Sequence, residues 1–245
     1  MQAGKRERHG RRFWIALVLL PVALAILVAL GTWQVKRLHW KEDLIASIEE
    51  RSHAEPLDVR GVEAALEAGE PIDYRAASAS GTFLHDKERH FFATFQGQSG
   101  YYLYTPLELD DGRFLFVNRG FVPYDRKETS TRPESLVAGE QQITGLARAR
   151  LAAKPSSLVP DNDEAGNIFY WKDLGRMAAS TGLPEGQVLP FFLDADATPV
   201  PGGLPRGGVT VIDLPNSHLQ YAITWYGLAL ALAGVSIFAW LKRKS

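Results

Sequence analysis

The residue with the clearest chemical setting is His218, which stands immediately before a long uncharged run, residues 219–241. In a helix, a rotation of about 100° per residue places His218 on one stripe with aromatic and small residues. These are Tyr221, Ala222, Trp225 and Ala229. A neutral imidazole above apolar walls at membrane depth has the chemistry to ligate haem iron. An aromatic belt at a membrane interface has the same composition, so the residues leave both interpretations open.

Gln34 closes the other apolar run, residues 13–34, where a side-chain amide needs a polar partner. Gln220 or Asn216, near the start of the second run, is the expected partner. Trp33 fits either contact with a ligand or simple anchoring of the helix at the interface. Three small residues lie on the stripe opposite His218 and are expected to pack on the first helix: Gly227, Ala231 and Gly234.

A second polar group lies between His85 and His90, which bracket Asp86, Lys87 and Glu88. Imidazole and carboxylate together could hold a metal ion. No further candidate ligand lies nearby in the sequence, so a solvated hairpin tip is the preferred interpretation.

The absence of several residue types and motifs excludes some classes of function. The sequence has no cysteine, which excludes disulfides, thiolate metal sites, CxxC redox pairs and covalent c-type haem attachment. It also lacks P-loop, GxGxxG, HExxH, GxSxG and EF-hand motifs, which argues against an ordinary nucleotide-using or hydrolytic enzyme. We therefore expect no catalytic residues.

Two transmembrane helices are expected, at residues 13–34 and 216–241, because each run is apolar over the length needed to cross a bilayer. Basic tails at 1–12 and 242–245 predict that both termini are cytoplasmic. A signal peptide would share the basic start, but this apolar run is longer than usual and shows no evident cleavage pattern. The intervening domain, 35–215, is then exported, and its excess of acidic residues disfavours nucleic acid as a partner.

The pattern between the spans predicts a strand-rich α+β domain, with an antiparallel sheet rolled toward a barrel. Helical spacing continues past the first span until Pro56, and short helices are expected at 62–68 and 173–181. Period-two patterns predict strands at 74–84, 101–109, 114–121, 141–149, 188–193 and 209–213. Asp110-Asp111-Gly112 is expected to be a hairpin turn.

Short motifs occur in a fixed order from about residue 31 to 227. They are Gly31-Thr32-Trp33-Gln34-Val35 with Arg37, Trp40 and Lys41; Tyr74-Arg75 and Gly81; Val117-Asn118-Arg119-Gly120-Phe121-Val122-Pro123; Pro201-Gly202-Gly203; and residues 216–227. Together they resemble the Surfeit-locus family of cytochrome c oxidase assembly proteins. A short stretch between Phe92 and Gly100, where some relatives carry an insertion, is the one departure.

This resemblance implies an assembly factor for haem-copper cytochrome c oxidase that binds haem a and aids its insertion into the catalytic subunit. It implies His218 as the ligand of haem iron, Trp225 and Tyr221 as walls, and Gln34 and Trp33 as weaker contacts. Expected partners are the catalytic subunit, haem a synthase and membrane lipid. Asn118, Arg119 and Gly120 match a family motif, but we expect them to form a strand end where glycine permits a tight bend.

Two alternatives remain open. The first is a membrane-anchored scaffold that stabilises an oxidase assembly intermediate without binding haem. The second is a two-span envelope regulator similar to polysaccharide chain-length proteins, although their long helical domains contrast with this strand-rich pattern. The short basic start favours a bacterial inner membrane, with the central domain in the periplasm.

Overall fold

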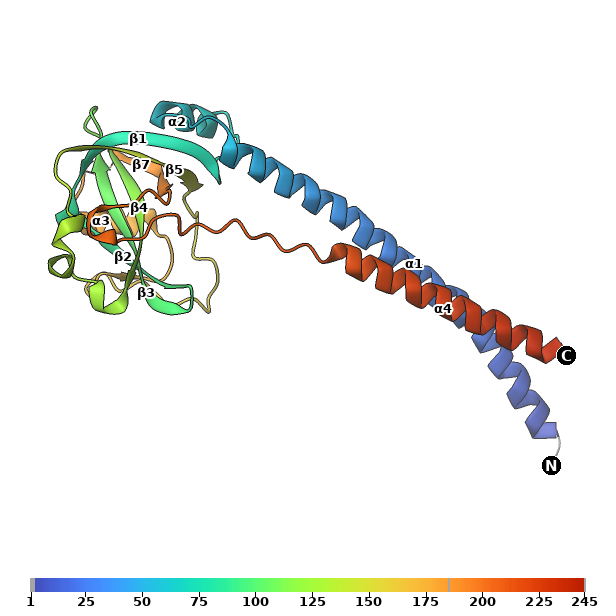
Figure 1. Ribbon diagram of the computed structural model, residues 1–245. Coiled ribbons are helices and arrows are strands. Elements are labelled where there is room, and N and C mark those ends of the chain that lie inside the picture. Colours follow the sequence, from blue (N-terminus) through green and yellow to red (C-terminus); the bar gives the residue numbers. More distant parts are fainter. Residues whose placement is uncertain (1–2, 185, 245) are drawn as a thin grey trace. The chain divides into compact units, whose positions relative to one another are not determined.

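A computed structural model describes the backbone of residues 3–184 and 186–244, and side chains from 18 to 242 except at 185 (Figure 1). The chain forms two compact units. One comprises Met1–Ser47 and Asp213–Ser245 and is called the helix pair; the other, Ile48–Ile212, is called the barrel domain. The basic side chains expected at 1–12, and those of Arg243 and Lys244, lie outside the described side chains.

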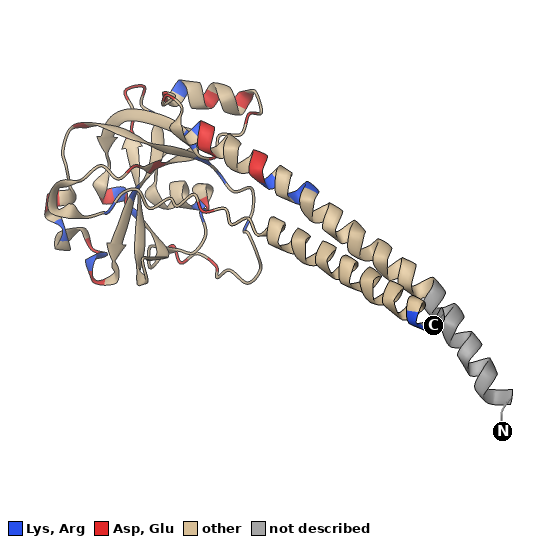
Figure 2. Ribbon diagram, turned by 45° about the vertical axis from the view of Figure 1, so that its right-hand side comes forward, with Lys and Arg blue, Asp and Glu red and all other residues tan. Residues whose placement is uncertain are grey.

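Two long helices could each span a membrane. Helix α1, Ala3–His53, continues through Pro21, and helix α4 covers His218–Lys244. Their described parts, Val18–His53 and His218–Lys242, are long and apolar enough to cross a bilayer. Figure 2 shows no charged residue on α1 from Val18 until Lys36, nor on α4 before Lys242. The expected continuation of the first span into a second helical segment, ending before Pro56, is confirmed.

The barrel domain is built on a sheet that closes on itself. Five strands form the closed part: β1 Arg75–Phe83, β3 Gln98–Glu108, β4 Phe114–Pro123, β5 Glu140–Ala149 and β7 Val188–Ala195. They follow the order β1-β5-β7-β4-β3, and β3 pairs again with β1. All these pairs are antiparallel except β4 with β7. The expected rolled sheet is therefore confirmed, although one of its ladders is parallel.

Two strands extend the sheet beyond the closure. Strand β2, Arg89–Phe95, pairs with β3, and the two-residue β6, Ile168–Phe169, pairs in parallel with β2. The sequence prediction missed β2, while the strand expected at 209–213 is wrong because these residues form no ladder. The other expected strands are confirmed within a few residues.

Short helices complete the barrel domain. Helix α2, Val59–Glu67, has Asp58 as its N-cap, and α3, Leu174–Thr181, is capped by Asp173 and Gly182. Single 3₁₀ turns are η1 His85–Lys87, η2 Tyr124–Arg126, η3 Thr129–Thr131, η4 Pro133–Ser135 and η5 Pro201–Gly203. The apolar face of α2 packs on one core cluster and that of α3 on another. Both helices thus cover sheet surface that water would otherwise reach.

Candidate functional site

The packed stripe of α4 starts at His218. Ala222 and Ala229 are buried, with 3% and 4% of their surface exposed. Half-buried residues continue the same stripe at alternating steps of three and four: His218, Trp225, Leu232 and Ser236. Such spacing is typical of a left-handed helix pair.

Glycine on α1 permits close approach to α4. A Cβ at Gly31 would lie 2.9 Å from the Tyr226 ring, and the Tyr226 hydroxyl lies 3.1 Å from Thr32 Oγ1. The expected packing of Gly227, Ala231 and Gly234 on α1 is wrong, because all three are exposed on the other side of α4. The buried contact instead follows the stripe that contains His218.

His218 and Gln34 contact each other across the helix pair. The Gln34 carboxamide oxygen lies 2.7 Å from His218 Nδ1, and Gln34 is only 9% exposed. The Asn216 side chain accepts a hydrogen bond from the backbone N–H of His218 at 3.4 Å. Our expected partners for Gln34, Gln220 or Asn216, were therefore wrong, although an amide at this depth did require a partner on α4.

The remaining expected site residues lie in different environments. Trp225 is half-buried on the same stripe as His218. Tyr221 and Trp33 are 53% and 56% exposed, so both face away from the packed stripe. The structure therefore brings His218 and Gln34 into contact, keeps Trp225 on their face of α4, and leaves the other two rings on the outer surface.

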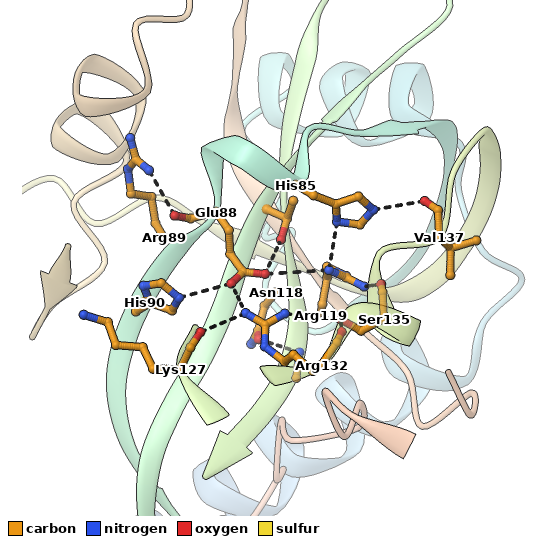
Figure 3. Close-up of polar contacts among 12 residues, drawn as sticks. His85, Glu88, Arg89, His90, Asn118, Arg119, Lys127, Arg132, Ser135 and Val137 are labelled. Atoms are coloured by element: carbon orange, nitrogen blue, oxygen red, sulfur yellow. Dashed lines mark hydrogen bonds and ion pairs between the residues drawn. The ribbon is translucent and has the colours of Figure 1, made fainter. Parts of the chain in front are cut away.

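A second polar cluster lies inside the barrel domain around Glu88 (Figure 3). Its carboxylate accepts a hydrogen bond from Arg132, lies 3.1 Å from His90 Nε2 and is 3.7 Å from Arg119 Nη1. We call Glu88, His90, Arg119, Arg132 and His85 the Glu88 cluster. The expected solvated hairpin tip is wrong, because Glu88 and His90 are only 3% and 6% exposed. The described residues contain no cluster of three or more histidine, aspartate or glutamate side chains placed to hold a metal ion.

A β-bulge directs Arg119 into this cluster. Tyr102 pairs with Phe121 and Tyr104 with Asn118, so Arg119 and Gly120 together oppose one residue of β3. Gly120 thus lies inside β4 rather than at the expected strand end. It adopts φ +118°, and a Cβ there would lie 1.9 Å from the carbonyl oxygen of Arg206. Only glycine permits this close approach.

The Glu88 cluster holds the segment between β4 and β5. Arg119 donates to the carbonyl of Ser135 at 2.6 Å, and Arg132 donates to the carbonyls of Arg126 and Lys127. The two guanidinium groups share the Glu88 carboxylate and also donate to backbone carbonyls, so we assign the cluster a structural role. Sequence reasoning missed Arg132 altogether, since it lies 44 residues from Glu88 and no local pattern marks it.

Three groups of the cluster have shifted pKa values, and burial lowers the pKa of one of them, Arg119, to about 10. Burial lowers the pKa of His85, and the charge of Arg119 lowers it further, while its bond to the Val137 carbonyl raises it. Burial alone would raise the pKa of Glu88, but His90 and Arg132 outweigh burial and hold that pKa below its usual value. Folding therefore favours neutral His85 and ionised Glu88.

These shifts predict that acid destabilises the barrel domain. Because the folded-state pKa values of His85 and Glu88 are both depressed, the unfolded chain binds more protons as the pH falls. Stability should be fully present above the ordinary histidine value of 6.5 and decrease as the pH falls below it. A further loss should begin below the ordinary glutamate value of 4.5. The urea midpoint of the full chain, measured from pH 8 to pH 4, checks this.

Matched histidine variants identify which histidine causes the loss of stability below the ordinary histidine value of 6.5. His85→Gln should flatten the profile between about pH 6.5 and 5, whereas His39→Gln, at an exposed position of α1, should leave it unchanged. A midpoint that stays constant down to pH 5 in the unaltered chain would contradict the assignment.

Comparison with known proteins connects these features to one family. Residues 22–230 match the SURF1 family. The chain belongs to the SURF1 family. It is 36% identical to Surfeit locus protein 1 of Homo sapiens over 98% of the chain and 80% of that protein. It is 35% identical to a SURF1-like protein of Monosiga brevicollis, with 99% and 92% covered.

Family membership confirms the resemblance found in the sequence motifs. The SURF1 match covers both His218 and Gln34, as well as the Asn118-Arg119-Gly120 bulge. A protein of Takifugu rubripes named Surfeit locus protein 1 is also similar, at 34% identity over 93% of this chain and 96% of that protein. The chain therefore has a role in cytochrome c oxidase assembly and carries two membrane helices.

Proposed function

We propose that this SURF1-family protein binds haem a through His218 and aids its insertion into the catalytic subunit of a haem-copper oxidase. The supporting observation is the contact between His218 Nδ1 and Gln34, which leaves Nε2 without a hydrogen bond among the described residues. Nitrogen in a neutral imidazole is a common ligand of haem iron. The half-buried ring of His218 is therefore suited to the ligation of haem iron that this function requires.

Aromatic residues of both helices are proposed to contact the haem. Trp225 on the packed stripe and Tyr221 on the outer surface are proposed to flank the macrocycle, with Trp33 contributed by α1, while Gln34 contacts His218. Bound haem would supply an iron centre and a strong visible absorption. The chain itself would bind and orient haem without chemical turnover, so we do not propose an enzyme.

The proposed location rests on the two apolar helices and on the distribution of charge along the sequence. We place α1 and α4 in a bacterial inner membrane with both termini in the cytoplasm and the barrel domain in the periplasm. Outside the two basic tails the chain holds 27 of its 28 acidic residues but only 19 of its 27 basic residues. Such an excess of acidic residues favours protein partners over nucleic acid. We propose the oxidase catalytic subunit and haem a synthase as these partners.

Replacing His218 tests haem binding directly. The full chain is purified from a host that makes haem a, and its Soret band is compared with that of His218→Ala. We expect the variant to lose at least about tenfold in bound haem, because the iron loses its protein ligand. His39→Ala, at an exposed position of α1, is the matched control and should keep the unaltered spectrum.

The same preparations distinguish the scaffold alternative. A chain that is colourless in every variant, yet copurifies with the oxidase catalytic subunit, would support a scaffold that binds no haem. An unchanged Soret band in His218→Ala would remove His218 from the proposed role.

A further inference from the structure

We propose that Gln34 is the positioning residue of His218: it keeps the ring proton on Nδ1 and so presents Nε2 as the ligand nitrogen. This inference rests on the proposed function, because Nε2 is presented as a ligand only if His218 binds haem iron. Its physical content, the protonation pattern of one imidazole, concerns the chain without haem and can be tested separately.

The burial of Gln34 makes a polar partner necessary. Its side chain lies in the packed stripe of the helix pair, where 9% of the residue is exposed, and its carboxamide oxygen is 2.7 Å from His218 Nδ1. Water is scarce at this depth, so an amide oxygen without a protein donor would remain unsatisfied. The contact with His218 satisfies this oxygen, so losing the contact is unfavourable in free energy.

The contact with Gln34 also determines which ring nitrogen of His218 carries the proton. A carboxamide oxygen only accepts hydrogen bonds, so the contact requires a hydrogen on Nδ1. In a neutral imidazole one nitrogen carries the hydrogen and the other carries the lone pair. The lone pair of His218 is therefore on Nε2, which makes no hydrogen bond among the described residues. Iron ligation requires this arrangement.

Neighbouring contacts also orient His218. The Asn216 side chain accepts from the backbone N–H of His218 at 3.4 Å, while Gln34 holds the ring from the other helix. Further along α4, Tyr226 makes a second polar contact between the helices, with Thr32 at 3.1 Å. Residues that hold the second nitrogen of a metal-ligating histidine typically change metal affinity 10- to 100-fold when they are lost. Gln34 stands in that relation to His218.

The decisive experiment uses the haem-free full chain, labelled with ¹⁵N at histidine and held in lipid nanodiscs. The nitrogen shifts distinguish the two neutral tautomers, and His218→Ala assigns the signal. We expect the Nδ1–H form in the unaltered chain and a shift toward the Nε2–H form in Gln34→Leu. Gln34→Glu, which keeps an acceptor oxygen, should retain the Nδ1–H form. The same tautomer in the unaltered chain and in Gln34→Leu would overturn the proposal.

A haem titration of the same variants gives the functional consequence. Gln34→Leu should weaken haem binding about 10- to 100-fold, and Gln34→Glu should restore most of it. Gln220→Leu is the matched control, because the Gln220 side chain is exposed on α4 and makes no hydrogen bond among the described residues. Weaker haem binding with an unchanged tautomer would overturn positioning and make Gln34 a direct contact. A confirmed tautomer shift without haem binding to any variant would instead contradict the proposed function alone.

Discussion

Glu88→Ala is expected to lower the free energy of unfolding of the barrel domain by about 3–5 kcal/mol. The substitution leaves two guanidinium groups, whose side chains are 3% and 5% exposed, without their shared carboxylate. Arg132 and Arg119 cannot reach water without moving the segment that they hold. Urea denaturation of the full chain in detergent, followed by the near-ultraviolet circular dichroism of buried tyrosines, measures the loss.

Glu63→Ala is the matched control for this prediction. Glu63 also pairs with an arginine, Arg113, but the two side chains are 24% and 31% exposed. Water can replace most of that interaction, so we expect a loss below about 1 kcal/mol. Equal losses for the two variants would show that the Glu88 cluster is not what stabilises the segment between β4 and β5.

Gly120→Ala is the second variant for which we expect a large effect. A side chain at φ +118° is strained, and its Cβ would lie 1.9 Å from the carbonyl oxygen of Arg206. Backbone strain contributes about 1–3 kcal/mol, and forcing the two segments apart adds about 1–3 kcal/mol. The urea midpoint of the full chain should fall accordingly, with Arg119 withdrawn from the Glu88 cluster.

Gly97→Ala separates the effect of close packing from that of backbone conformation. Gly97 also has a positive φ, +79°, in the turn between β2 and β3, but nothing lies within 4 Å of a Cβ there. Only the conformational cost remains, about 1–2 kcal/mol. If Gly97→Ala proved as destabilising as Gly120→Ala, the contact with Arg206 would not explain the requirement for glycine.

Local patterns predicted most of the fold. Uninterrupted apolar length identified both long helices, and alternation identified five strands of the closed sheet. Strand β2 was missed because charged residues precede it and its buried members include His90, a residue read as solvent-exposed. Residues 209–213 have strand-forming side chains but no ladder; the chain just before them pairs with β4 through an isolated bridge between Arg206 and Phe121. Pairing depends on which segments meet in the fold, which a local pattern does not reveal.

The contacts around His218 and Glu88 were less accessible to sequence reasoning. The sequence indicated that Gln34 needed a partner but not which residue of α4 would face it, because that depends on how the helices pack. Gly31 and Tyr226 set this rotation by their close contact. Arg132 reaches Glu88 only because the bulge at Arg119 and the following turns bring distant segments together. Motif resemblance indicated His218 as a candidate haem ligand, and its contact with Gln34 depends on how the two helices pack.

Closure of the sheet also bears on how the domain avoids aggregation. Open strand edges expose rows of unpaired amides that recruit neighbouring chains. Pairing of β1 with β3 at Thr82 and Phe83 closes the ring of five strands, and the outermost strand, β6, has two residues. Closure therefore reduces the strand edge that is available for intermolecular β-pairing, in a domain that has no cysteine for covalent cross-links.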